Sequence, residues 1–337
     1  GKAVSDFGAR RAHNMDAAVY GARASYIGGA AGTATVLAGQ MFGIPVSGTM
    51  AHSWVMYYKD EYEAFRHYAE NYPDNTILLV DTYDTIKSGI PNAIRVAREV
   101  LEPMGKRLKG IRIDSGDLAY QSIKVRKMLD DAGLTDCKII VSNSLDEHTI
   151  SSLNMQKARI DGYGVGERLI TGASSDYSED SISLLGAVYK IAAVEENGGF
   201  APRIKVSGSV EKITNPGLKK VYRVYDQNGK AKADLIAKAD ETIDMSQEFR
   251  FVDPDMPWRN LKFTHCTVRP LQEKIFENGK LVYKLPTLNE IRAYVKKQLD
   301  EEIWEEEQRF VNPHKHYMDM TPDYYDMKMS LLNDSRM

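Results

Sequence analysis

The chain has 337 residues, of which 43% are hydrophobic, and its formal net charge is −3. This length predicts a sizeable core and two domains, and the dispersed basic residues exclude a nucleic-acid surface. Its two cysteines, Cys137 and Cys266, lie far apart without metal-ligand spacing, so we expect a reduced, cytoplasmic protein without disulfides or a zinc site. No apolar run approaches the length of a membrane span, so no membrane partner is expected.

In the first half of the chain, short apolar runs are followed by polar or glycine-rich residues. The first is His52, on a turn of small residues after Ile44–Val46, and the second is Asp81, after Thr76–Val80. Arg112–Asp117 surround the end of a run at Ile113. Ser142–Ser144 follow Ile139–Val141, and Gly164–Arg168 follow Asp161–Tyr163. Functional residues of a (β/α) barrel lie at the carboxyl ends of its strands. These positions are therefore the candidate site.

The segments between these runs have the pattern of helices. Apolar residues recur at helical spacing from Tyr62 to Tyr72, from Pro91 to Leu101, from Leu118 to Ala132, and after a capping Asp146. Alternation of strand and helix at this period predicts a parallel sheet with right-handed crossovers. We expect an α/β fold with a (β/α) barrel, and an open doubly wound sheet is the alternative.

The pattern changes after a turn-rich segment that begins at Glu195. Val221–Tyr225 followed by Asp226–Gly229 predicts a strand that enters a hairpin, and Asn278-Gly279 predicts a second turn. An apolar stripe from Leu288 to Ile303 is typical of a long helix. We therefore assign residues 1–195 to the barrel domain. Residues 196–337 are assigned to the remainder of the barrel edge, a strand-rich accessory segment and a C-terminal helix.

His52 is the strongest catalytic candidate, because the other histidines have the pattern of surface or structural residues. Arg112 and Asp114 lie one residue apart, so both would leave the same face of a strand and suit a substrate with hydroxyl and phosphate groups. Asp117 could belong to the same site, but a helix cap explains an aspartate at this position equally well. Gly164-x-Gly166 would let backbone N–H groups approach an anion. These residues predict an enzyme for a phosphate-bearing substrate and leave its reaction open.

A set of motifs occurs in order along the chain. They are Asp6-Phe7-Gly8-x-Arg10-Arg11, Gly28-Gly29, Gly32-Thr33-x-Thr35, Gly48-Thr49-x-Ala51-His52-Ser53, Asp81-Thr82-Tyr83-Asp84-Thr85, Arg112-x-Asp114-Ser115-Gly116-Asp117, Gly164-Val165-Gly166 and Leu285-Pro286-Thr287-Leu288. Together they resemble the nicotinate phosphoribosyltransferases, a family of type II phosphoribosyltransferases. The resemblance runs from near residue 4 to the carboxyl end, and the family's N-terminal segment is expected to be absent.

The resemblance implies an irregular α/β barrel beside a domain built from both chain ends, in a homodimer with shared active sites. It also implies ATP-coupled synthesis of nicotinate mononucleotide from nicotinate and 5-phosphoribosyl-1-pyrophosphate in NAD salvage, with ATP as co-substrate and Mg²⁺ as cofactor. Two alternatives stay open. One is a nicotinamide phosphoribosyltransferase, and the other is a non-catalytic fragment that lacks the N-terminal part of the active site.

Roles for single residues follow from the same resemblance. His52 would be the phosphohistidine formed from ATP, Asp114 would hold ribose hydroxyls and Mg²⁺, and Arg112 would face the ribose and nicotinate. Phe7 would stack on the pyridine ring, and Arg10 would lie near its carboxylate or the phosphates. The other expected substrate-binding residues are Gly48 and Thr49, with Ser142, Asn143, Ser144, Gly164 and Gly166 for the 5-phosphate.

Ala34 bears on the choice between nicotinate and nicotinamide. The resemblance implies that nicotinamide-using relatives carry Asp between the threonines of the Gly-Thr-x-Thr motif, where this chain has Ala34. A carboxylate there would repel the carboxylate of nicotinate, so Ala34 favours nicotinate. Ser144 departs from the family pattern, in which Asp is common, and its contact stays open.

Overall fold

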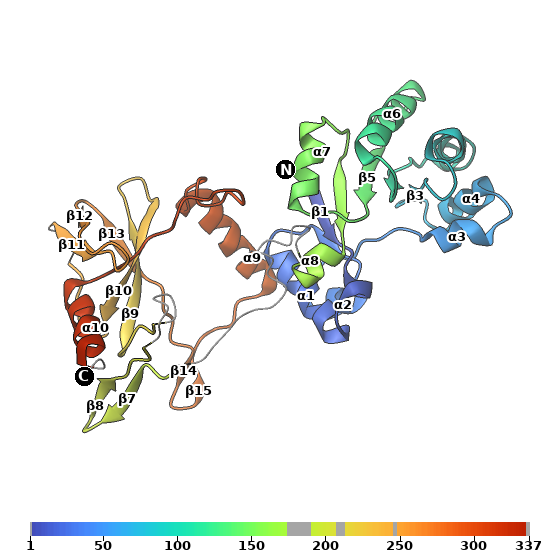
Figure 1. Cartoon of the computed structure of the whole chain (residues 1–337). Helices are drawn as coiled ribbons and strands as arrows, with labels where there is room; N and C mark the ends of the chain where they lie inside the picture. Colours follow the sequence, from blue (N-terminus) through green and yellow to red (C-terminus); the bar gives the residue numbers. More distant parts are fainter. Residues whose placement is uncertain (1, 174–189, 207–212, 245–247, 335–337) are drawn as a thin grey trace. The chain divides into compact units, whose positions relative to one another are not determined.

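The computed structural model describes residues 2–173, 190–206, 213–244 and 248–334 of the chain (Figure 1). The chain divides into two compact units, residues 1–185 and 186–337, each with its own main sheet. The division that the sequence indicated at residue 195 stays a prediction. Within the described residues, no helix is both long enough and apolar enough to cross a lipid bilayer.

The first unit is built on a six-stranded parallel sheet with the order β2-β1-β6-β5-β4-β3. Its strands are β1 (Ala3–Asp6), β2 (Gly32–Thr33), β3 (Ile77–Leu79), β4 (Gly110–Ile113), β5 (Lys138–Ser142) and β6 (Gly162–Val165). The predicted α/β barrel class is confirmed. Among the described residues, however, β2 and β3 are the two edges of an open half-barrel.

Helices follow these strands. They are α1 (Met15–Ile27), α2 (Val36–Phe42), α3 (His52–Tyr57), α4 (Glu61–Asn71), α5 (Ile90–Val96), α6 (Leu118–Asp131), α7 (Glu147–Met155) and α8 (Glu167–Thr171). Helices α4 to α7 lie where the periodicity predicts them, whereas α1, α2, α3 and α8 were not predicted. Asp117 and Asp146 cap α6 and α7 by accepting hydrogen bonds from the backbone N–H groups of Tyr120 at 2.9 Å and Thr149 at 2.7 Å. These caps fix where each strand-to-helix loop ends.

The core of the first unit lies between the sheet and its helices. Leu78, Ile111 and Ile139 on neighbouring strands are fully buried, as is Phe65 of α4. Complete burial of such a side chain stabilises the fold by roughly 1.5–3 kcal/mol. This packing holds the carboxyl ends of β3, β4 and β5 at one edge of the sheet, where the polar residues begin.

One predicted strand is reduced to a bridge. Val46 pairs only with Thr33, and the neighbouring hydrogen bonds run from Thr33 N to Pro45 O and from Ser47 N to Thr33 O, both at 3.0 Å. Pro45 has no backbone N–H to extend the ladder, which explains the short pairing. His52 therefore does not directly follow a strand but begins helix α3.

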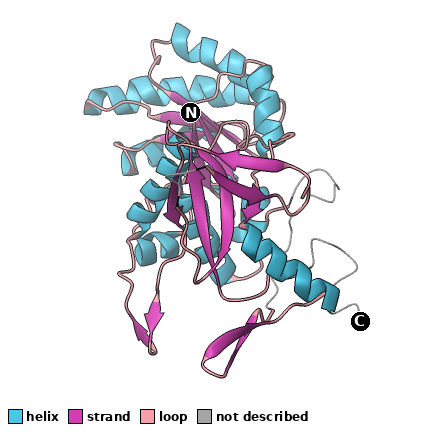
Figure 2. Ribbon diagram, turned by 90° about the vertical axis from the view of Figure 1, so that its left-hand side faces the viewer, coloured by secondary structure: helices cyan, strands magenta, loops and turns pink. Residues whose placement is uncertain are grey.

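The second unit has a mostly antiparallel sheet with the order β12-β11-β16-β10-β9-β13. Its strands are β9 (Lys219–Tyr225), β10 (Ala231–Lys238), β11 (Phe249–Val252), β12 (Asn260–Phe263), β13 (Thr267–Pro270) and β16 (Met318–Met320). The predicted hairpin after Tyr225 is confirmed by the antiparallel pairing of β9 with β10. Two hairpins stand apart from that sheet (Figure 2): β7-β8 (Ala193–Glu196 and Gly199–Pro202) and β14-β15 (Phe276–Glu277 and Lys280–Leu281).

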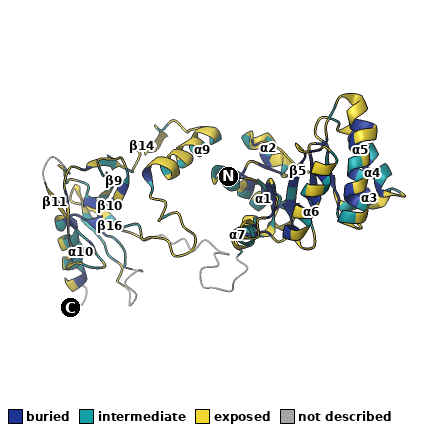
Figure 3. Ribbon diagram, turned by 90° about the horizontal axis from the view of Figure 1, so that it is seen from above, coloured by how far each residue is buried: buried dark blue, intermediate teal, exposed yellow. Residues whose placement is uncertain are grey.

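Two helices complete the second unit. Helix α9 (Leu288–Lys297) carries the predicted apolar stripe and continues as a π-helical turn, Gln298–Glu302, so Ile303 lies beyond its end. No residue of α9 is buried among the described residues, and Figure 3 shows the helix largely exposed. Helix α10 (Pro322–Asp334), which the sequence pattern did not predict, contributes the buried Tyr324 to the cluster around Ile236.

A histidine between two carboxylates makes the stability of the second unit depend on pH. His316 places Nδ1 2.9 Å from Oε2 of Glu307 and Nε2 3.3 Å from Oδ2 of Asp234. The contact with Asp234 raises the pKa of His316 above its ordinary value of 6.5, although burial opposes this. Because the folded-state pKa is the higher one, the stabilisation is complete below the unfolded pKa and is lost as the pH rises through the folded pKa.

We expect His316→Gln to lower the free energy of unfolding by about 1.5–3 kcal/mol at pH 6 and by less at pH 9. Urea unfolding followed by circular dichroism at both pH values measures this, and His13→Gln, at an exposed histidine, is the control. An equal loss at the two pH values would contradict the ion-pair explanation.

Candidate active site

Arg112, near the end of β4, joins the edge of the sheet to the segment before α3. Its Nε donates to Ser142 Oγ at 2.8 Å, its Nη1 to Thr49 Oγ1 at 2.9 Å and its Nη2 to Asp114 Oδ1 at 2.8 Å. Only 16% of the side chain is exposed. The planar guanidinium, with a fixed partner on each nitrogen, is therefore held in one orientation.

Asp114 is an ionised carboxylate at this edge. Burial favours its neutral form, but hydrogen bonding from Ser142 Oγ and the charge of Arg112 outweigh that effect and lower the pKa of Asp114. The side chain is 27% exposed, so the carboxylate is accessible to a ligand. At neutral pH the site therefore offers a fixed negative charge beside a fixed positive one.

Asp81, directly beyond β3, supports both Asp114 and His52. Its Oδ2 accepts hydrogen bonds from Asp114 N at 2.9 Å and Ser115 Oγ at 2.6 Å. The side chain is 2% exposed, and its buried Oδ1 has no hydrogen-bond partner among the described residues. The sequence pattern places Asp81 at a strand end and predicts no role for it. The available signal is a carboxylate that follows a buried apolar run.

His52 brings an accessible nitrogen to these carboxylates. Its Nδ1 is 3.1 Å from Oγ1 of Thr82, and its Nε2 is 3.6 Å from Oδ2 of Asp114 and 3.9 Å from Oδ1 of Asp81. The imidazole is 39% exposed. If Thr82 accepts the Nδ1 proton, Nε2 carries the free lone pair, so this ring can act as a nucleophile or base.

At the end of β1, the buried Asp6 shapes the turn that carries Phe7. Its Oδ1 accepts from Gly8 N at 2.8 Å and its Oδ2 from Thr33 Oγ1 at 2.7 Å. The Phe7 ring lies against Gly164 of β6, where a Cβ would come within 2.5 Å of two ring carbons. Glycine is required for this contact, and it leaves the ring available at the strand ends.

The loop after β5 has an unusual backbone. Asn143 and Ser144 have φ angles of 91° and 49°, in the left-handed region that few residues other than glycine adopt. Such conformations often occur at binding sites, where the surrounding structure holds them. Ser142 points its hydroxyl at Asp114, so the loop extends the polar edge of the site.

Most of the predicted site residues surround one cavity of about 310 Å³. Its lining includes Phe7, Arg10, Arg112, Asp114, Ser142, Asn143, Ser144, Gly164 and Gly166. Gly48 and Thr49 instead line a neighbouring cavity of about 350 Å³, which shares Phe7 with the first. His52 lines neither cavity and lies beside Asp114. The structure thus brings the predicted residues together, with Phe7 at the boundary of two spaces.

The resemblance implies Mg²⁺ held by Asp114, and the carboxylates of Asp81 and Asp114 together fit such a divalent cation. Mg²⁺ prefers oxygen ligands and is commonly held by one or two carboxylates together with substrate phosphates. The unpartnered Oδ1 of Asp81 and the accessible carboxylate of Asp114 provide such oxygens. Among the described residues there is no group of three or more potential metal-ligating side chains, so the substrate would supply the remaining ligands.

Known proteins are similar to this chain in sequence and in fold. A family model described as "Nicotinate phosphoribosyltransferase (NAPRTase) family" matches residues 2–242, and one described as "Nicotinate phosphoribosyltransferase C-terminal domain" matches residues 218–328. The nicotinate phosphoribosyltransferase of Bacillus subtilis (strain 168) is 48% identical over 332 residues, which are 98% of this chain and 65% of that protein. The Dictyostelium discoideum protein of the same name is 34% identical over 99% of this chain and 64% of its own length.

The crystal structure of human nicotinic acid phosphoribosyltransferase is similar, with a TM-score of 0.79 and 26% identity over 98% of this chain and 71% of that one. Nicotinate-nucleotide pyrophosphorylase from Pyrococcus furiosus gives a TM-score of 0.60 and 27% identity over 89% of this chain and 66% of that one. The chain spans 65% and 64% of the two curated relatives described above.

We expect Gly164→Ala to displace the Phe7 ring and to destabilise the first unit by roughly 1–3 kcal/mol, as overpacking does. Thermal unfolding measures the loss, and a matched control is Gly28→Ala, whose Cβ would make only ordinary contacts at 3.5 Å. Equal stability of the two variants would mean that the Phe7 ring is free to move away.

Proposed function

Since the chain belongs to the nicotinate phosphoribosyltransferase family, we propose that it catalyses the synthesis of nicotinate mononucleotide from nicotinate and 5-phosphoribosyl-1-pyrophosphate in NAD salvage. The observation that carries the proposal is the network in which Arg112, Asp114, Asp81 and His52 meet at one edge of the sheet. It combines charges for an anionic sugar substrate with an accessible imidazole.

In the proposed reaction, the ring nitrogen of nicotinate forms a bond to C1 of the ribose as the bond from C1 to pyrophosphate breaks. The transition state carries positive charge on the sugar, and the ionised carboxylate of Asp114 stabilises it electrostatically. Mg²⁺ held by Asp81 and Asp114 would neutralise charge on the leaving pyrophosphate. Arg112 orients Asp114 and balances its charge.

The pyridine ring is proposed to stack on Phe7, with its carboxylate near Arg10 or Arg112. The guanidinium carbon of Arg112 lies 5.4 Å from the centre of the Phe7 ring, so an anionic aromatic ligand beside Phe7 meets a positive charge. The 5-phosphate is proposed to bind the backbone N–H groups at Gly164–Gly166 and the hydroxyls of Ser142 and Ser144. These groups line the same cavity.

His52 is proposed to couple ATP to the synthesis. Nε2 would attack the terminal phosphorus of ATP, so that a phosphorus–nitrogen bond forms, the phosphorus–oxygen bond breaks and ADP leaves. Thr82, at 3.1 Å from Nδ1, supports the tautomer with a free Nε2 lone pair. Water would later hydrolyse the phosphoramidate to phosphate. Mg²⁺ at the two nearby carboxylates would reduce their repulsion of the incoming phosphate.

We also propose that the protein is a cytoplasmic homodimer with shared active sites. The apolar stripe of α9 supports a dimer, because an amphipathic helix without a buried residue among the described part of the chain needs a surface to cover it. Phe7 would cover one face of the substrate's pyridine ring, and the other face likewise calls for a contact from outside this cavity. The two cysteines, both buried and free, accord with a reducing compartment.

Nicotinate is favoured over nicotinamide by Ala34. Its backbone N–H donates to Asp6 O at 2.8 Å, which puts it beside the turn that carries Phe7. A carboxylate at this position would lie near the substrate's carboxylate, and a neutral methyl group does not repel it.

We expect His52→Ala to abolish the stimulation of synthesis by ATP, a fall of roughly tenfold or more in rate, while slow ATP-independent synthesis continues. Incorporation of acid-labile phosphate from γ-labelled ATP should be lost in parallel. His67→Ala, at a surface histidine paired with Glu63 and Glu70, is the control. Retention of labelled phosphate by His52→Ala would assign the phosphorylation to another residue.

Ala34→Asp is expected to raise the KM for nicotinate by on the order of tenfold, through repulsion between two like charges. The neutral Ala34→Ser variant should change it little. Steady-state kinetics with nicotinate and nicotinamide measure both effects. An unchanged KM for nicotinate in Ala34→Asp would remove Ala34 from the ring pocket.

A further inference from the structure

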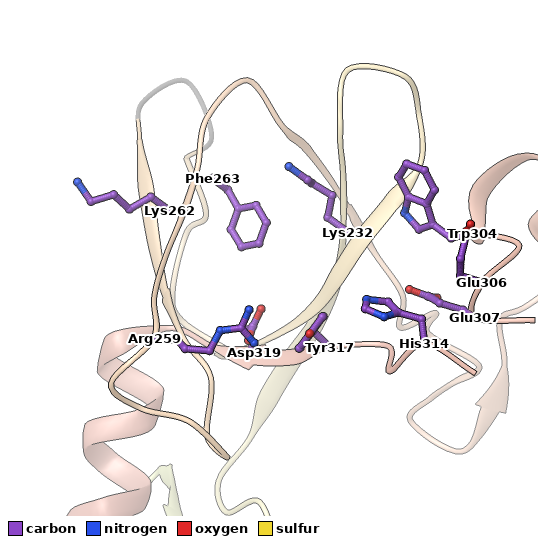
Figure 4. A pocket seen from close by; sticks show the side chains of 10 residues that line it. All are labelled: Lys232, Arg259, Lys262, Phe263, Trp304, Glu306, Glu307, His314, Tyr317 and Asp319. Carbon is purple, nitrogen blue, oxygen red and sulfur yellow. The ribbon is translucent and has the colours of Figure 1, made fainter. Parts of the chain in front are cut away.

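A separate cavity of about 540 Å³ lies against the sheet of the second unit (Figure 4). Lys232 of β10, Phe263 of β12 and Tyr317, next to β16, line it, and Trp304 contributes from the segment after α9. Its volume falls within the range of small-ligand sites, roughly 300–1,000 Å³. The reaction proposed for the first unit gives this cavity no role.

Two cations lie over aromatic rings in this cavity. Lys232 Nζ is 5.5 Å from the centre of the Phe263 ring, and Arg259 Cζ is 5.3 Å from the centre of the Tyr317 ring. The indole of Trp304 is fixed, because its Nε1 donates to Ala231 O at 2.8 Å. Rings with cations at their faces suit a planar ligand that carries an anionic group.

Three other charged side chains around the cavity already have partners. Lys262 pairs with Glu248 at 2.6 Å, Glu306 with Arg309 at 3.6 Å and Glu307 with His316 at 2.9 Å. Among the described residues, no close ion pair involves Lys232 or Arg259, although hydrogen bonding to Tyr317 and the negative charges of Asp253 and Asp319 raise the pKa of Arg259. Two positive charges are therefore available to an anion.

Asp319 at the base of the cavity lacks the donors that a buried carboxyl requires. It is 1% exposed, and neither carboxyl oxygen has a hydrogen-bond partner among the described residues. Burial, together with the negative charge of Asp253, raises the pKa of Asp319 to about 6. A ligand hydroxyl or amino group that donates to Asp319 would offset the cost of its burial.

We propose that this cavity is a binding site for a nucleoside monophosphate. The base lies against Phe263 and Trp304, the phosphate binds Lys232 and Arg259, and a sugar hydroxyl or exocyclic amine donates to Asp319. This ligand class meets the three requirements of the cavity at once: a planar ring, an anion and a hydrogen-bond donor.

Isothermal titration calorimetry of the full chain with AMP tests the proposal. We expect a binding event whose affinity falls about tenfold, equivalent to 1.4 kcal/mol, in Lys232→Ala and in Arg259→Ala. Asp319→Asn keeps the side-chain shape but replaces an acceptor with a donor, and it should weaken binding as well. Lys220→Ala, at an exposed lysine of β9 outside the cavity, is the matched control and should bind as the wild type does.

Arg112→Ala, which alters only the site in the first unit, should retain the AMP event. Adenosine, without the anion, and ribose 5-phosphate, without the ring, should each bind more weakly than AMP. The proposal is overturned if Lys232→Ala and Arg259→Ala both bind AMP as the wild type does. It is also overturned if Arg112→Ala abolishes binding, if ribose 5-phosphate binds as well as AMP, or if millimolar AMP gives no heat of binding.

Discussion

The candidate active site depends on one nearly buried guanidinium. Arg112 donates to Ser142, Thr49 and Asp114, which come from the end of β5, the segment before α3 and the loop after β4. A buried charge is tolerated only when its donors are satisfied, so these three groups must stay in place for the sheet edge to be stable. The same geometry lowers the pKa of Asp114 and keeps it an ionised carboxylate, as the proposed reaction requires.

Two further carboxylates position the residues that would contact substrate. Asp6 bonds Gly8 N and Thr33 Oγ1 and thereby shapes the turn at Phe7, and Asp81 bonds Asp114 N and approaches His52. Asp6 has both oxygens bonded, whereas the buried Oδ1 of Asp81 has no partner among the described residues. A buried oxygen without a hydrogen-bond partner costs stability. A bound cation is one explanation for such an oxygen.

The second unit also relies on paired charges, and it leaves an apolar helix face exposed. The ion pair of Arg223 with Asp234 joins β9 to β10. It lies in the same sheet as a small apolar core. Helix α9 leaves an apolar stripe uncovered among the described residues. An amphipathic helix of this kind gains stability when another surface buries its apolar stripe, which is the basis of the proposed dimer.

The sequence alone determined the local features of this protein. Apolar runs located β3 to β6, and helical periodicity located α4 to α7 of the first unit. Asp146 marked the start of a helix, and the order of motifs identified the family. These signals depend only on near neighbours in the chain. Tertiary structure decided the rest. Asp81 could not be assigned a partner from its motif, since the contact with Asp114 arises from the pairing of β3 with β4. The need for glycine at position 164 follows only from the pairing of β6 with β1, which places Gly164 against the Phe7 ring. Long-range contacts of this kind are set by strand order and register, which local patterns do not encode.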